Sequence, residues 1–176
     1  MQNQSTKKLV FVSLCIAIGL LLPQIVRLLP IANAGSVLLP MHIPVLICGY
    51  VAGEKYGLLT GLVLPPLAFF LTGMPPLFPV GVSMMLELAT YGLLTGLLYR
   101  LTKGKIILPL IGAMIGGRIV YGIVNTILFG MSDIPFGMEA FIAGGFVTAL
   151  PGIIIQLILI PPIVQALKNA NLVIEN

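Results

Sequence analysis

Charged side chains are scarce in this 176-residue chain. It has nine Lys and Arg, five Asp and Glu and a single His, so that 8% of its residues are charged and 59% are hydrophobic. A soluble domain is about 25% charged. The composition therefore excludes a soluble globular domain, a disordered chain and a nucleic-acid-binding protein, and it predicts an integral membrane protein.

The motifs of catalysis and metal binding are missing as well. The chain has no Gly-rich phosphate loop that ends in Gly-Lys-Ser or Gly-Lys-Thr, so it does not hydrolyse ATP by that route. One His and two Cys make neither a metal-ligand cluster nor a disulfide framework. Cys15 and Cys48 both lie in apolar runs, where a Cys packs like a small hydrophobic residue. We expect no enzyme, no metal and no cofactor in this chain.

Long apolar runs, separated by short polar or Pro/Gly-rich segments, fill the sequence. A membrane-spanning helix needs about 20 apolar residues, which predicts one all-α membrane domain over residues 1–176. The expected spans are residues 7–29, 41–53, 56–71, 79–101, 106–129 and 138–167. The second and third are short, so we expect them to be tilted or to lie inside the bundle. Prolines predict an interruption at Pro65-Pro66 and kinks at Pro151 and Pro161-Pro162.

The basic residues predict the orientation. If the N-terminus is cytoplasmic, seven of the nine basic residues fall at inner ends of spans, whereas Asp133 and Glu139 fall in the last outer loop. This distribution follows the positive-inside rule and predicts that both termini are cytoplasmic in the plasma membrane of a prokaryotic cell. The seven are Lys7, Lys8, Lys55, Arg100, Lys103, Lys105 and Lys168.

Small residues recur at helix-packing spacing. The heptapeptide Tyr-Gly-Leu-Leu-Thr-Gly-Leu occurs at residues 56–62 and again at 91–97. It is either an inverted repeat of the kind found in transporters or a shared packing motif, and the unmatched flanking sequence favours packing. The first span carries Ser13-x-x-x-Ala17 and Cys15-x-x-x-Gly19, which let another helix approach closely. We expect these four residues to contact a partner membrane protein.

Four ionisable residues in the expected spans need an explanation: Arg27, His42, Glu87 and Arg118. Such groups are costly in lipid and mark functional sites by default, although Arg27 is near enough to an outer end to extend toward water. Glu87 is eight residues, or about 12 Å, from the outer end of its span, and Arg118 is eleven residues, or about 16 Å, from its own. The two can therefore meet, either as an ion pair that fixes helix register or as a site where Arg118 binds an anionic substrate group and Glu87 orders it.

Polar neighbours extend two helix faces toward the outside. Arg118, Tyr121 and Asn125 share one face, and Ser83, Glu87, Thr90 and Tyr91 share another. These faces predict a cavity that opens outward between the loops at residues 30–40 and 72–78. The candidate substrate-binding residues are Arg118, Asn125, Tyr121, Glu87, Ser83, Tyr91, His42 and Met84.

Three segments carry a resemblance to a known family. They are Leu-Pro-Met-His-Ile-Pro-Val at residues 39–45, Leu-Thr-Gly-Met-Pro-Pro-Leu-Phe-Pro at 71–79 and Met-Leu-Glu-Leu-Ala-Thr-Tyr-Gly at 85–92. The sequence resembles the S component, the substrate-binding membrane subunit, of the energy-coupling factor (ECF) vitamin importers of prokaryotes. Within that family it is most similar to the pantothenate type.

The resemblance implies that this chain binds the substrate and that other subunits use ATP. An S component captures its vitamin from outside, joins a transmembrane coupling protein and two cytoplasmic ATPases, and topples in the membrane to release the vitamin inside; ATP is used by the partners. Family members contact the coupling protein through small residues of the first span, often Ala-x-x-x-Ala, to which Ser13-x-x-x-Ala17 corresponds here. The family site is built from the first outer loop and the outer halves of spans four to six. Arg118 would then bind the pantothenate carboxylate, with Asn125 and Tyr121 bonding the rest.

Other functions stay open at this point. An S component for cobalamin or another vitamin is one. A small stand-alone secondary transporter, which would work without ATPases, is another. A structural or assembly subunit, which would bind no small molecule, is the third.

Overall fold

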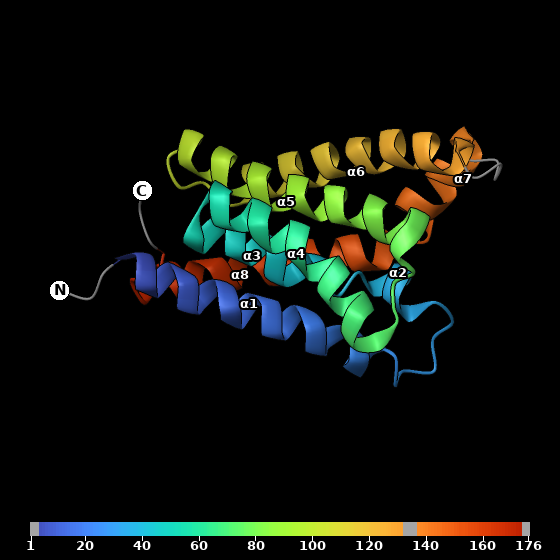
Figure 1. Ribbon diagram of the computed structural model, residues 1–176. Coiled ribbons are helices and arrows are strands. Elements are labelled where there is room, and N and C mark those ends of the chain that lie inside the picture. Colours follow the sequence, from blue (N-terminus) through green and yellow to red (C-terminus); the bar gives the residue numbers. More distant parts are fainter. Residues whose placement is uncertain (1–3, 132–136, 174–176) are drawn as a thin grey trace.

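The computed structural model describes residues 4–131 and 137–173, and all regular secondary structure in these two segments is helical (Figure 1). Six segments are long and apolar enough to cross a membrane, which confirms the predicted all-α architecture with six spans. The helices are α1 (Gln4–Val26), α2 (Ala34–Leu38), α3 (His42–Ala52), α4 (Glu54–Thr72), η1 (Leu77–Gly81), α5 (Val82–Leu101), α6 (Ile107–Gly130), α7 (Met138–Ile142), η2 (Ala143–Val147) and α8 (Leu150–Asn169).

The prolines break the helices less than the sequence suggests. Helix α4 continues through Pro65-Pro66, so the expected interruption is wrong, and α8 continues without a break through Pro161-Pro162, where a kink stays a prediction. A proline inside a membrane helix is tolerated where neighbouring helices and local adjustments satisfy the freed carbonyls. The last span does break, but just before Pro151, which occupies the start of α8 where its missing N–H costs nothing.

Helix α3 lies at the centre of the bundle. Nine of its eleven residues are buried, and it packs against α1, α4, α5 and α8. The expectation that a short second span lies inside the bundle is therefore correct. The short helix α2 precedes it, in a segment expected to be a loop. The third span is a full 19-residue helix, α4, rather than a short one.

The repeated heptapeptide is the contact between α4 and α5. Gly57 and Gly92 occupy the same position in the two copies, and a Cβ on either would overlap the backbone of the other. A Cβ on Gly61 would likewise overlap the backbone at Leu88 and Ala89. These close approaches let the two antiparallel helices pack along their length, and they support the packing interpretation of the repeat.

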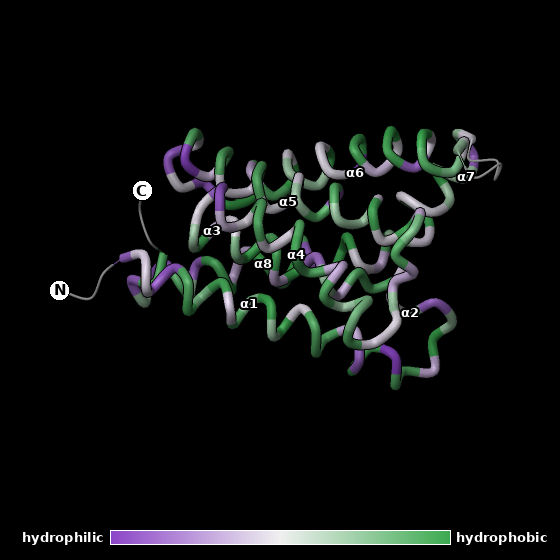
Figure 2. The backbone as a smooth tube through the Cα atoms, in the orientation of Figure 1, coloured by the Kyte–Doolittle hydropathy of each residue, from purple (hydrophilic) through white to green (hydrophobic). Residues whose placement is uncertain are grey.

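The start of α1 and the end of α8 lie at the same end of the bundle (Figure 1). Lys7, Arg100, Lys103 and Lys168 line one cavity there, and Arg100 pairs with Glu54 at 2.7 Å. Polar segments gather at the ends of the bundle, while the spans are mostly apolar (Figure 2). The positive-inside rule predicts that this end is the cytoplasmic one. Asp133 lies outside the described residues.

Candidate functional site

A cavity of about 470 Å³ lies at the opposite end of the bundle from the termini, between α1, the α2–α3 segment, η1–α5 and α6. Its volume is within the range of small-molecule sites, about 300–1,000 Å³. Seven of the eight residues that the sequence predicts for the site line it. They are His42, Ser83, Met84, Glu87, Arg118, Tyr121 and Asn125.

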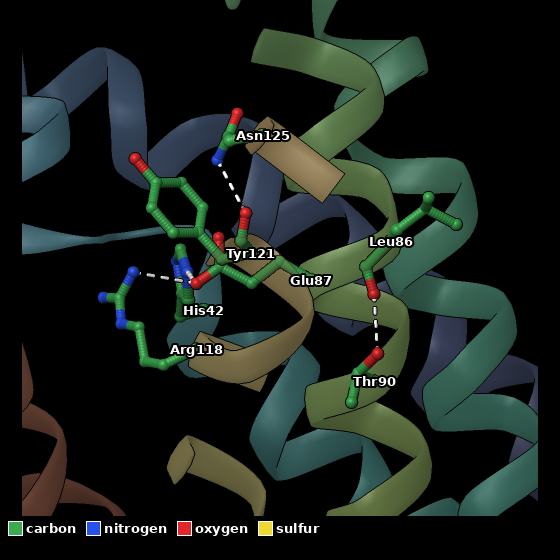
Figure 3. A network of polar contacts seen from close by, with 7 residues as sticks. All are labelled: His42, Leu86, Glu87, Thr90, Arg118, Tyr121 and Asn125. Carbon is green, nitrogen blue, oxygen red and sulfur yellow. Dashed lines mark hydrogen bonds and ion pairs between the residues drawn. The ribbon is translucent and has the colours of Figure 1, made fainter. Parts of the chain in front are cut away.

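Three charged or titratable side chains meet at the floor of this cavity (Figure 3). Arg118 Nη1 donates a hydrogen bond to Glu87 Oε1 at 2.8 Å, and His42 Nε2 lies 3.6 Å from the same oxygen. The side chains of all three are at most 5% exposed. The meeting of Glu87 and Arg118 at similar depth, which the spacing predicts, is therefore confirmed, and His42 joins them because α3 begins at this level.

Unpaired polar atoms concentrate at this cavity. Eight buried side-chain nitrogen and oxygen atoms of the described residues have no hydrogen-bond partner, and five of them belong to His42, Ser83 and Arg118. Buried polar groups in proteins are nearly always hydrogen-bonded, and leaving one unpaired costs about 1–3 kcal/mol. Five such atoms around one cavity are typical of a site that is completed by a polar ligand or by water.

Helix α6 presents Arg118, Tyr121 and Asn125 on one face, as predicted. The Tyr121 ring centroid lies 5.7 Å from the Arg118 guanidinium carbon, within the range of a cation–π contact. Asn125 Nδ2 donates to the Tyr121 carbonyl at 2.9 Å. Phe141 of α7 stacks on Tyr121 and packs over Gly122, where a Cβ would come within 2.7 Å of the Phe141 ring. The outer end of the last span therefore fixes the position of Tyr121.

Two predicted residues of the α5 face do not reach the cavity. Tyr91 is 1% exposed and packs edge-to-face on His42, with ring centroids 5.1 Å apart, and its ring fills the space over Gly117. Thr90 bonds the Leu86 carbonyl at 2.8 Å and points away from the cluster (Figure 3). The i, i+3, i+4 pattern defines a stripe wide enough to include positions that pack against neighbouring helices, so it places both residues too close to the site.

The mouth predicted between the loops at residues 30–40 and 72–78 is confirmed, because Asn33 and Ser36 of the first loop and Met74 of the second line the cavity. Sequence reasoning missed Gln24 and Arg27, which also line the cavity; Arg27 was expected only to extend toward water. Arg27 is exposed, and its Nη1 lies 3.3 Å from Gln24 Oε1. The signal that was available is the group of polar residues between 24 and 36, beside the first outer loop.

The four small residues of α1 separate onto two sides of the helix. Ser13 and Ala17 are exposed, whereas Cys15 and Gly19 are buried. Cys15 packs with Cys48 of α3, and a Cβ on Gly19 would press into the Leu64 side chain. Only Ser13 and Ala17 therefore remain available for contact with a partner.

The chain matches the family model described as "ECF transporter, substrate-specific component" over residues 7–164. Neither the comparison with curated proteins nor that with solved structures gives a match. The matched region includes all but the ends of the chain, and with it every residue of the cavity. The chain therefore belongs to the family of substrate-specific components of ECF transporters.

Proposed function

We propose that this substrate-specific component captures pantothenate from outside the cell and hands it to the rest of an ECF importer. Membership of the family implies a substrate-binding subunit of a transporter rather than an enzyme, and partners from an ECF module. The proposal adds the ligand and the residues that hold it.

The free edge of Arg118 carries the proposal. Glu87 accepts a hydrogen bond from Nη1 of Arg118, while Nε and Nη2 of Arg118 have no hydrogen-bond partner among the described residues. Those two nitrogens form the side of a guanidinium group that binds a carboxylate with two parallel hydrogen bonds. Nε and Nη2 of Arg118 are both buried. For a carboxylate to bind them, the guanidinium group has to move toward the cavity. Pairing this edge removes the cost of two buried donors without partners.

The rest of the cavity suits the rest of pantothenate. The molecule has one carboxylate, one amide and two hydroxyl groups, and the cavity offers unpaired polar atoms on His42 and Ser83 beside the Tyr121 and Asn125 side chains. Met84 and Met74 add adaptable apolar surface for its methyl groups and methylene chain. Cobalamin has a corrin ring and a nucleotide loop, is several times larger than pantothenate and lacks a free carboxylate. A cavity of about 470 Å³ with a free Arg edge therefore favours pantothenate over cobalamin.

Energy for transport comes from other subunits in this proposal. The sequence carries no ATP-binding loop, so a transmembrane coupling protein and two cytoplasmic ATPases supply the work. The exposed Ser13 and Ala17 stripe of α1 is the proposed contact with the coupling protein, and toppling of the whole bundle would turn the cavity toward the cytoplasm.

Calorimetric titration of pantothenate into the detergent-purified chain tests the ligand and the role of Arg118 together. Arg118→Gln should weaken binding at least roughly tenfold, because a hydrogen bond to a charged group contributes about 1.5–3 kcal/mol. The matched control is Arg27→Gln, which removes the same charge from the mouth of the same cavity and should change affinity little. Equal affinity of the wild type and Arg118→Gln would overturn the assignment, and cobalamin binding in place of pantothenate would overturn the ligand.

A further inference from the structure

A second, larger cavity lies at the cytoplasmic end of the bundle. Its volume is about 840 Å³, and it is lined by residues from α1, α3, α5, the turn between α5 and α6, and the end of α8. It belongs to a different end of the molecule from the outward-facing cavity and shares no lining residue with it.

Among the residues that the structure describes, four cations and no carboxylate line this cytoplasmic cavity. The cations are Lys7, Arg100, Lys103 and Lys168. Arg100 is neutralised by Glu54, whose Oε1 lies 2.7 Å from its Nη1. Among the described residues, no carboxylate lies within ion-pair distance of the other three. The cavity therefore carries an excess of about three positive charges.

Helix dipoles explain only part of this charge. Arg100 and Lys168 occupy the last turns of α5 and α8, where a cation interacts favourably with the helix C-terminus. Lys7 lies near the N-terminal end of α1, where a cation is disfavoured, and Lys103 lies in a turn at a φ of 54°. Helix stabilisation therefore does not account for these two lysines, whose presence at this end of the bundle follows the positive-inside rule.

The lining of the cytoplasmic cavity includes Gly49, Gly53, Gly96 and Gly104. Gly49 and Gly96 are points of close helix approach, because a Cβ on either would overlap the backbone of a neighbouring segment. Tyr50 and Tyr99 form an aromatic wall, with ring centroids 5.2 Å apart, and Tyr50 donates to the Ile106 carbonyl at 2.6 Å. Lys168 reaches across from α8 toward the turn, since a Cβ on Gly104 would lie 3.3 Å from its Nζ. Cations at the rim and an aromatic, glycine-lined interior together make a recess for a group with an anionic head.

We propose that the cytoplasmic cavity binds a phosphate group, either on the headgroup of an anionic phospholipid or on a soluble phosphate compound. Basic recesses between membrane helices on the cytoplasmic side recognise phosphate-bearing headgroups. The three lysines without carboxylate partners supply point charges that suit a phosphate. This site is independent of the identity of the transported substrate.

Native mass spectrometry of the delipidated, detergent-purified chain tests the proposal. The probes are phosphatidylglycerol, which is anionic, and phosphatidylcholine, which has the same phosphate but no net charge, with inorganic pyrophosphate as the soluble arm. The wild type should retain one phosphatidylglycerol in preference to phosphatidylcholine, or should bind pyrophosphate. If only phosphatidylglycerol binds, the cavity is a site for a lipid headgroup. If pyrophosphate displaces the lipid, the cavity is a site for a soluble phosphate compound.

A pair of double variants keeps the test specific. Lys103→Gln/Lys168→Gln removes two lining charges and should weaken anion binding roughly tenfold or more, because each lysine near the membrane surface contributes to anion attraction. Lys55→Gln/Lys105→Gln removes two charges from the same end of the bundle outside the cavity and should keep binding. Thermal melting in detergent checks that both fold. The proposal would be overturned if both double variants lost anion binding to the same extent, if both kept it, or if the wild type bound no anion.

Discussion

Arg118 of α6 donates a hydrogen bond from Nη1 to Oε1 of Glu87 on α5 across 2.8 Å, with both side chains almost fully buried. The pair joins two neighbouring antiparallel helices at one depth in the membrane. Two roles fit this geometry: a strut that fixes the helices, and a ligand-binding group held in place by its own counterion. Variants that remove both charges separate the two.

Replacing the whole pair should preserve the fold and abolish binding. Breaking a buried pair by removing one partner costs about 3–5 kcal/mol, whereas replacing both partners by apolar residues of similar volume is often neutral. We therefore expect Arg118→Met to lower the melting temperature in detergent and Glu87→Met/Arg118→Met to restore it. If the double variant, once stable, still binds pantothenate as the wild type does, the pair is a strut and Arg118 is not a ligand-binding residue.

The glycine contact between α4 and α5 should tolerate no side chain. A Cβ on Gly92 would overlap the Gly57 backbone, and neither backbone can move without separating the helices. Overpacking of this kind costs about 1–3 kcal/mol or more, so Gly92→Ala should lower the melting temperature. Gly130→Ala is the control, because a Cβ there meets no atom within 4 Å. Similar melting of the two variants would show that the contact is less close than described.

The exposed stripe of α1 should govern assembly without affecting ligand binding. Ala17→Trp places a large side chain on the proposed contact with the coupling protein, whereas Ile18→Trp places it on the neighbouring exposed position, which is already occupied by a large residue. Co-purification with the ECF module should fail for the first variant and succeed for the second, and both should bind pantothenate. If the Ala17→Trp variant still co-purified with the ECF module, the contact with the coupling protein would have to lie on another face.

Thiol labelling checks the orientation. Both native cysteines are buried, and their replacement by Ala leaves a background for single cysteines at Lys103 and Met131, which are exposed at opposite ends of the bundle. A membrane-impermeant maleimide should label Met131→Cys in intact cells and Lys103→Cys only after the cells are opened. The reverse pattern would place the termini, and the cation-lined cavity, outside.

The meeting of Glu87 and Arg118 at the floor of the outer cavity could be predicted from spacing alone. The helix rise gives Glu87 and Arg118 similar depths, and the helical period places Tyr121 and Asn125 above Arg118. These are local properties of a regular helix, and the structure keeps them. The number of spans likewise follows from the length and spacing of the apolar runs, and the structure confirms six; their direction in the membrane stays a prediction from the positions of the basic residues.

The remainder depends on how the helices pack, which the sequence does not encode locally. His42 meets Glu87 only because α3 packs against α5 at the centre of the bundle. Tyr91 lies on the face predicted for the site, yet its ring packs between His42 and Gly117. The loop at residues 30–40 could be placed at the mouth, but which of its side chains line the cavity, among them Asn33 and Ser36, depends on how an irregular loop folds, and no periodic pattern predicts that.

Identification of the molecule that co-purifies with the chain tests the central claim most directly. Expressed in a host that makes pantothenate and purified in detergent, the wild type should release pantothenate on denaturation, close to one per chain by mass spectrometry. Arg118→Gln, purified in parallel, should release little. Recovery of another compound from the wild type, or equal recovery from both proteins, would contradict the account.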